Sequence, residues 1–225
     1  MLRLPAVLAD FTGRDQQILD IAARLCSEAN QAGLPALRGM GGVGKTSLAI
    51  RVAHQVKNSF PDGQLFLELR GTADGVKERP LTAVETMCRV VRAFQSDAFI
   101  LPGDPNELAG IYRTVLADKR VLILLDNVGS ETQIRTLLTA PPPARFLITS
   151  RHIQFVDGVV PITLDPLPID EACALFRRTT TAKITKSKLT TIVGLCGRLP
   201  LALRVAGDFL RLKEDWTVPR FIAAL

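Results

Sequence analysis

The sequence has few of the features that mark membrane or secreted proteins. No apolar run approaches the roughly 18 residues that a membrane-spanning helix needs. The opening segment, residues 1–11, is too short and turns polar too soon to be a secretory signal. The four cysteines, Cys26, Cys88, Cys173 and Cys196, are scattered and form no CxxC pair. We therefore expect reduced thiols in a cytoplasmic protein that has no membrane partner.

The composition is that of a folded chain rather than a disordered one. Hydrophobic residues make up 47% of the 225 residues and charged residues 22%, and the mean hydropathy is positive. Such a chain can bury the core of one large domain or two small ones. It is too apolar for a disordered segment, and it contains no internal repeat and no low-complexity tract.

The net charge of +6 is concentrated in the last quarter of the chain. Residues 177–220 contain ten lysines and arginines against three acidic residues. One interpretation is a nucleic-acid-binding surface. The simpler one is a solvated face of helices, because basic charge alone indicates only non-specific attraction.

Strand-like and helix-like segments alternate along the first 160 residues. The run 121–125 is continuously apolar, which is typical of a central parallel strand covered on both faces. Strands separated by helices predict an α/β fold with a parallel sheet sandwiched by helices. The expected strands are 34–37, 64–69, 121–125, 145–149 and 159–164, and the expected helices are 15–30, 45–56, 82–94 and 107–116.

The pattern changes after the loop at 165–168, where no strand signal returns. Four helices are expected there, at 170–178, 188–196, 201–211 and 218–224. We therefore predict a first domain over 1–165 and a small, all-helical subdomain over 166–225.

The segment GMGGVGKT at 39–46 matches the phosphate-binding pattern GxxxxGK[ST], with an expected strand before it and an expected helix after it. Its glycines allow left-handed backbone angles and a close approach to the ligand, and the loop amides turn inward around phosphates. The first domain is thus predicted to be a P-loop NTPase domain that binds ATP or ADP. The predicted phosphate-binding residues are Gly41, Gly42, Val43, Gly44, Lys45, Thr46 and Ser47.

Two of these residues have further expected roles. Lys45 reaches the terminal phosphates and the Thr46 hydroxyl ligates Mg²⁺. A P-loop also needs an acid that orients the metal, and Asp126 follows the apolar run 121–125, where its carboxylate would emerge at the ligand-binding edge of the sheet. The alternative for Asp126 is an ordinary strand-end residue that caps a turn.

The chain resembles the NB-ARC class of STAND ATPases, the switch modules of apoptotic, plant immune and many bacterial regulatory proteins. Five segments in order carry the resemblance: FTGR at 11–14, GMGGVGKT at 39–46, LILLDNV at 122–128, LITSR at 147–151 and GRLPLAL at 197–203. FPDGQLF at 60–66 and LDN at 125–127 look most like actinobacterial transcriptional regulators of antibiotic biosynthesis that contain such a core.

The resemblance implies further site residues. Thr12 and Arg14 would lie beside the adenine and ribose, Arg151 would sense the γ-phosphate, and Pro200 would pack on the adenine. Each has an ordinary alternative. Thr12 could cap a helix with Asp15 three positions on, Arg151 could be solvated, and Pro200 could simply begin a helix.

The chain departs from the family pattern at two points. Asn127 stands where many members carry a second acid, and an amide can hydrogen-bond water but cannot accept its proton. Hydrolysis is therefore expected to be slow or absent. The family continues with a winged-helix subdomain whose histidine contacts ADP, and neither His54 nor His152 fits that role. The chain thus looks like the ATPase core of a longer protein.

The favoured function is an ATP/ADP-binding switch whose slow hydrolysis, involving Lys45, Asp126, Asn127 and Arg151, controls conformation or oligomerisation. The expected cofactors are ATP or ADP and Mg²⁺. Expected partners are the other domains of the full-length chain and further copies of it, with DNA reached through another domain. The alternatives are a non-hydrolytic nucleotide-binding scaffold and direct DNA binding through the basic C-terminal helices. No NKxD guanine signature is present.

Overall fold

The computed structural model describes residues 4–27, 33–71, 79–95, 100–151, 156–213 and 215–224. Its centre is a five-stranded parallel sheet with the strand order β2-β3-β4-β1-β5. The strands are β1 (Leu34–Arg38), β2 (Gly63–Glu68), β3 (Val121–Val128), β4 (Arg145–Ser150) and β5 (Val159–Thr163). The α/β class predicted from the sequence is confirmed.

Helices cover both faces of the sheet, and the two-residue repeat of each strand divides the core between them. On β3, Leu122 and Leu124 pack with helices α1 (Asp15–Cys26) and α2 (Lys45–Gln55). Ile123 and Leu125 point to the opposite face. There they meet α3 (Ala83–Phe94) and α4 (Pro105–Leu116).

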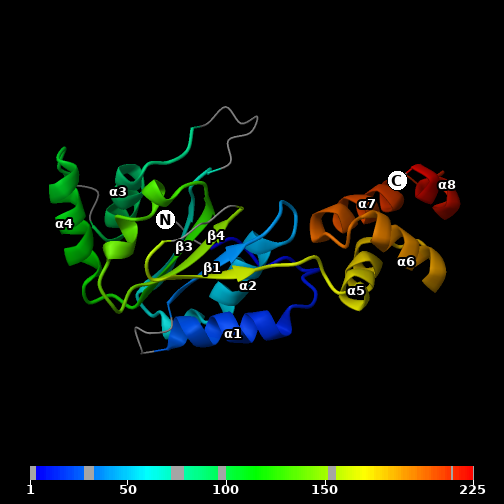
Figure 1. Ribbon diagram of the computed structural model, residues 1–225, viewed down its shortest axis with the longest axis horizontal. Coiled ribbons are helices and arrows are strands. Elements are labelled where there is room, and N and C mark those ends of the chain that lie inside the picture. The colour runs from blue at the N-terminus through cyan, green and yellow to red at the C-terminus, as the bar shows by residue number, and fades with distance from the viewer. Residues whose placement is uncertain are drawn as a thin grey trace.

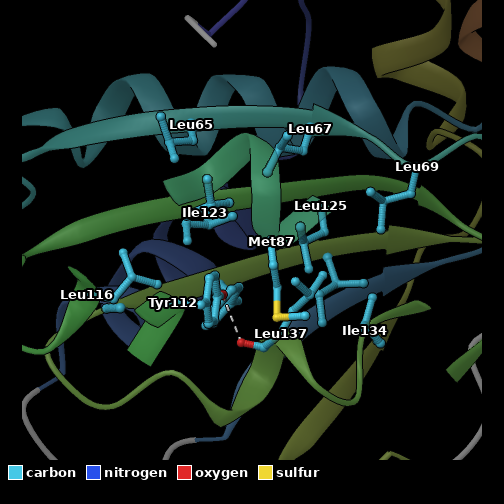
Figure 2. Close-up of a cluster of buried hydrophobic side chains, with 14 of the residues drawn as sticks. Leu65, Leu67, Leu69, Met87, Tyr112, Leu116, Ile123, Leu125, Ile134 and Leu137 are labelled. Atoms are coloured by element: carbon cyan, nitrogen blue, oxygen red, sulfur yellow. Dashed lines mark hydrogen bonds between the residues drawn. The ribbon is translucent and has the colours of Figure 1, made fainter. Parts of the chain in front are cut away.

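A buried hydrogen bond joins two residues of the cluster on the α3 and α4 face (Figure 2). The Tyr112 hydroxyl donates a hydrogen bond of 2.9 Å to the Leu137 carbonyl. Leu137 belongs to a short 3₁₀ turn, η4 (Leu137–Thr139), in the β3–β4 connection, which also contains η3 (Glu131–Gln133). A third such turn, η2 (Lys57–Ser59), follows α2. The hydroxyl thus fixes the connection that leads into β4, the strand beside the candidate site.

Four helices follow the sheet: α5 (Ile169–Thr179), α6 (Lys186–Leu195), α7 (Pro200–Leu212) and α8 (Val218–Ala224). They gather at one end of the molecule, away from α3 and α4 (Figure 1). They enclose a core of their own, which includes Leu175, Phe176, Ile192, Leu203 and Phe221. A helical subdomain therefore follows the sheet domain. β5 ends and α5 begins on either side of the predicted boundary at 165/166, and that boundary stays a prediction.

Two elements differ from their expected bounds. Helix α1 ends at Cys26 rather than at residue 30, and 28–30 lie outside the described residues. Strand β3 was expected to end at Leu125 but runs to Val128, so Asp126 and Asn127 lie within it. Within the described part of the chain, no helix combines the length and the apolar character needed to cross a membrane.

Candidate functional site

The loop between β1 and α2 has the backbone that its glycines permit. Gly39, Gly42 and Gly44 have φ angles of 145°, 77° and 98°, a region in which other residues are strained. Gly44 is the N-cap of α2, and no side chain caps that helix end. The amides of the first turn of a helix lack partners within the helix, and with the helix dipole they favour an anion at this end.

Two cationic side chains lie at this loop. The Lys45 ammonium folds back over it and donates to the Gly39 and Met40 carbonyls at 2.7 and 2.9 Å. Burial lowers the pKa of Lys45, and the charge of Arg151 lowers it further, whereas Asp126 opposes the shift. The Arg151 guanidinium lies beside Gly41, where an added Cβ would be 3.7 Å from Nη2. The loop is therefore lined with positive charge.

Asp126 forms the floor of the site. Its side chain is 6% exposed, and its Oδ1 accepts hydrogen bonds from the Thr46 hydroxyl at 2.7 Å and the Thr149 hydroxyl at 2.6 Å. Burial raises the pKa of the Asp126 carboxyl, while these hydrogen bonds and the charge of Lys45 oppose the increase. The structure thus brings together Thr46 and Asp126, both named from the sequence, and adds Thr149, which the sequence did not indicate.

The oxygen set suits a hard cation such as Mg²⁺. Hydroxyl and carboxylate oxygens, completed by phosphate and water, are the ligands that Mg²⁺ takes beside nucleotides. Among the described residues, no group of three or more His, Cys, Asp or Glu side chains is placed to hold a metal by itself. A metal here would therefore be held by Thr46 and Asp126 together with the bound nucleotide.

Asn127 stands at an irregularity where β3 leaves its regular pairing with β4. Its φ is +55°, a left-handed conformation that asparagine tolerates better than most residues. Its amide donates to the Thr149 hydroxyl at 2.9 Å, and its carbonyl accepts from the Gly71 amide at 2.6 Å. The backbone of Asn127 is thus held from both sides.

The structure gives Thr12 and Arg14 local roles that the sequence did not indicate. Helix α1 begins at Asp15, and its N-cap is Arg14 without any side-chain cap, so the proposed Thr12–Asp15 capping box is wrong. The Thr12 hydroxyl instead donates to the Asp10 carbonyl at 2.8 Å. It turns toward its own segment because the chain passes through left-handed angles at Gly13 and Arg14 before the helix starts.

Arg14 is a buried cross-link, 5% exposed. One guanidinium nitrogen, Nη2, donates to the Val43 carbonyl at 3.0 Å and to the Asp165 carbonyl at 2.8 Å. Burial lowers the pKa of Arg14, and the charges of Glu171 and Asp165 oppose the shift. Arg14 thereby ties the phosphate-loop segment to the chain that enters the helical subdomain.

The helical subdomain touches the loop directly. Pro200 occupies the first position of α7, where its missing N–H costs nothing. Its Cγ would lie 3.6 Å from a Cβ added at Gly44. The next amide, that of Leu201, donates to the Gly42 carbonyl at 3.2 Å. The sequence singled out Pro200 but missed Leu201, whose only signal was a first-turn amide in need of an acceptor.

A further set of contacts joins the N-terminal segment to the same subdomain. Asp10 forms an ion pair of 2.7 Å with Arg204 of α7, and the Phe11 carbonyl accepts from Arg178 of α5 at 3.3 Å. A Cβ added at Gly13 would lie 1.9 Å from Glu171 Oε2. A larger residue at position 13 would displace the Glu171 side chain and would be strained at the φ of +74° that Gly13 adopts.

Most of the chain matches a known protein family. Residues 14–186 match the family described as "NB-ARC domain". The chain belongs to the NB-ARC family. The matched segment includes four residues of the site described above, namely Lys45, Thr46, Asp126 and Arg151. Pro200 lies beyond the end of that segment.

Curated relatives of this NB-ARC domain include two bacterial regulators. The chain is 38% identical to "Regulatory protein AfsR" of Streptomyces griseus and 36% identical to that of Streptomyces coelicolor. Each match covers 99% of the chain but 23% of the relative, so the domain spans about a quarter of those proteins. The chain is also 27% identical to "Disease resistance protein RPV1" of Vitis rotundifolia, and this match covers 95% of the chain and 16% of that protein.

Solved structures show the same fold at low identity. A STAND protein with a tetratricopeptide repeat sensor from Pyrococcus horikoshii matches with a TM-score of 0.59 at 18% identity, over 89% of this chain and 30% of that one. Cdc6p from Pyrobaculum aerophilum matches with a TM-score of 0.66 at 13% identity, over 93% and 65%.

The buried carboxylate gives a stability prediction that separates charge from hydrogen bonding. Asp126→Asn removes the buried charge and keeps an acceptor for Thr46 and Thr149, so the ligand-free protein should keep or gain free energy of unfolding at neutral pH. Asp126→Ala leaves both hydroxyls without that acceptor and should lose about 1–3 kcal/mol. Urea unfolding without nucleotide measures both. Equal losses in the two variants would show that the charge itself holds the fold.

Proposed function

We propose that this NB-ARC domain binds ATP or ADP with Mg²⁺ and acts as the nucleotide-dependent switch module of a larger regulatory protein. One observation carries the proposal: the loop that would hold the phosphates also accepts a hydrogen bond from the helical subdomain, from the Leu201 amide to the Gly42 carbonyl. A ligand that orders the loop thereby acts on the contact between the two parts of the chain.

Phosphate binding is supported by the charges at the loop. Lys45 is held by two loop carbonyls, Gly39 and Met40, which are weaker acceptors than a phosphate oxygen. We infer that Lys45 exchanges these carbonyls for phosphate when nucleotide binds. The Arg151 guanidinium lies beside Gly41, and we propose that it meets the terminal phosphate and so distinguishes ATP from ADP.

The adenine is proposed to lie near the junction of the two subdomains, with Pro200 on one side and the segment that contains Thr12 on the other. The support is the approach of Pro200 to Gly44 and the ties of residues 10–14 to α5 and α7. A ligand that contacts both parts stabilises their closed arrangement by its higher affinity for that arrangement. Other domains of the whole protein, or further copies of it, would respond to the change.

Turnover is proposed to be slow. Positioning and electrostatics supply most of the catalysis of phosphoryl transfer, and Asp126, Lys45 and Arg151 provide charges for it. Asn127 supplies no carboxylate that could accept a proton from water. The same residue supports the second candidate function, a nucleotide-binding scaffold that does not hydrolyse ATP.

Lys45→Ala tests the binding site. At an ADP·Mg²⁺ concentration of about 100 times the Kd, the free energy of unfolding of the wild-type protein should rise by roughly 2.7 kcal/mol. The variant should lose this gain and keep its ligand-free stability to within about 1 kcal/mol, because Lys45 gives up only two carbonyl bonds. Thermal unfolding with ADP, GDP or neither measures the effect, and Lys57→Ala, on an exposed turn, is the control.

Protection of the wild type by GDP as strong as that by ADP would contradict adenine selectivity. Full protection of the Lys45→Ala variant by ADP would contradict the site itself.

Asn127→Asp tests the cause of slow turnover. Aspartate tolerates left-handed angles as asparagine does, so the backbone at +55° should survive the change. The added carboxylate should raise steady-state phosphate release several-fold above wild type, and Asn127→Ala should not. Release from the Asp variant no faster than from the Ala variant would favour the non-hydrolytic scaffold.

A further inference from the structure

Thr149 is a buried hydroxyl at the point where β3 and β4 lose their regular pairing. It lies near the end of β4 and is 1% exposed. The register of the two strands shifts between the pairs Leu125–Ile148 and Val128–Ser150, and Thr149 faces this gap. Its hydroxyl accepts from the Asn127 amide at 2.9 Å and donates to Asp126 Oδ1 at 2.6 Å.

The direction of these two bonds is fixed by chemistry. An amide N–H can only donate, so the hydroxyl oxygen of Thr149 receives the proton of Asn127. The single hydroxyl proton is then available to Asp126, whose carboxylate can only accept when ionised. The hydrogen bonds therefore run in one direction, from the Asn127 amide through the Thr149 hydroxyl to Asp126 Oδ1. This direction favours the ionised carboxylate.

The second donor to the same oxygen is Thr46, the expected metal ligand. With both hydroxyls on Oδ1, the carboxylate cannot rotate without breaking one of the two bonds. A Mg²⁺ ion, or a water bound to it, would then meet a carboxylate of fixed orientation. Partners that fix the orientation of a metal-binding group are known to affect metal affinity strongly.

We propose that Thr149 is a positioning residue that holds Asp126 in the orientation required by Mg²⁺, and so sets how much Mg²⁺ strengthens nucleotide binding. The proposal rests on the proposed function, because it requires that the loop bind nucleotide. Thr149 does not touch the nucleotide in this scheme. It acts through Asp126 alone, so its loss should leave metal-free binding intact.

The test uses the 225-residue chain and a fluorescent ADP, whose affinity is measured by anisotropy in EDTA and in saturating Mg²⁺. Thr149→Val keeps the shape of the side chain and removes both hydrogen bonds. It should reduce the Mg²⁺-dependent gain in affinity by about tenfold or more, while the affinity in EDTA stays within about twofold of wild type. Thr149→Ser should restore the wild-type gain.

Thr86→Val is the matched control. Thr86 is also a fully buried threonine, and it lies in α3, away from the site. Its hydroxyl donates a hydrogen bond to the carbonyl of Thr82, the N-cap of that helix. It should leave both affinities unchanged. Trp216 fluorescence checks that the Thr149→Val variant folds. If it does not fold, Thr149→Cys replaces it, because a thiol is only a weak donor. The same loss of Mg²⁺ dependence is then expected.

The outcomes separate the two proposals. Wild-type protein that does not bind ADP would overturn the proposed function. Wild-type protein that binds ADP, together with a folded Thr149→Val variant of unchanged Mg²⁺ dependence, would overturn only the role of Thr149. A parallel loss of affinity in EDTA and in Mg²⁺ would also overturn it, because it would indicate a structural role in the loop.

Discussion

The hydrogen bond from the Leu201 amide to the Gly42 carbonyl joins the phosphate loop of this NB-ARC domain directly to its helical subdomain. Helix α7 begins with Pro200, so its first amide in need of an acceptor is that of Leu201. No side chain of α7 caps that end, and the acceptor comes from the phosphate loop of the other subdomain. In the proposed function, the loop would hold a nucleotide phosphate on its amides while one of its carbonyls accepts the hydrogen bond from the helix. A change at the phosphate would then act on the contact with the helix.

The second constraint is the buried carboxylate of Asp126. Burial raises its pKa, which means that the ionised form is costly in the folded protein. The two hydroxyls of Thr46 and Thr149 offset part of this cost. A charge that is kept buried and only partly compensated is characteristic of a functional site. The irregular part of strand β3 lies at the same point, where the left-handed Asn127 donates its amide to the Thr149 hydroxyl.

The local features of the fold could be predicted from the sequence, whereas the contacts between its parts could not. The apolar runs gave the strands, and the GMGGVGKT pattern gave the loop, because both depend on neighbours in the chain. The place of Arg14 beside the nucleotide stays a prediction, and the sequence did not indicate its hydrogen bonds to two backbone carbonyls, one of them 151 positions away. The alternative role of Thr12 as a helix cap is wrong, because left-handed angles at the next two residues, which capping patterns do not reveal, delay the start of the helix. From the sequence, Thr149 was only the last residue of an expected strand. Its contacts with Asp126 and Asn127 depend on the irregular pairing of β4 with β3.

Hydrogen exchange at the Leu201 amide tests the link between nucleotide and helical subdomain most directly, because that amide is itself the donor. Backbone exchange would be followed by NMR or mass spectrometry without nucleotide, with ADP·Mg²⁺ and with a non-hydrolysable ATP analogue. The amide of Leu203, which bonds within its own helix to the Leu199 carbonyl, is an internal reference. If nucleotide and helical subdomain are linked in this way, ADP·Mg²⁺ slows exchange at Leu201 more than at Leu203, and the ATP analogue protects Leu201 less than ADP does. Equal exchange at Leu201 in all three states, with nucleotide bound, would contradict it.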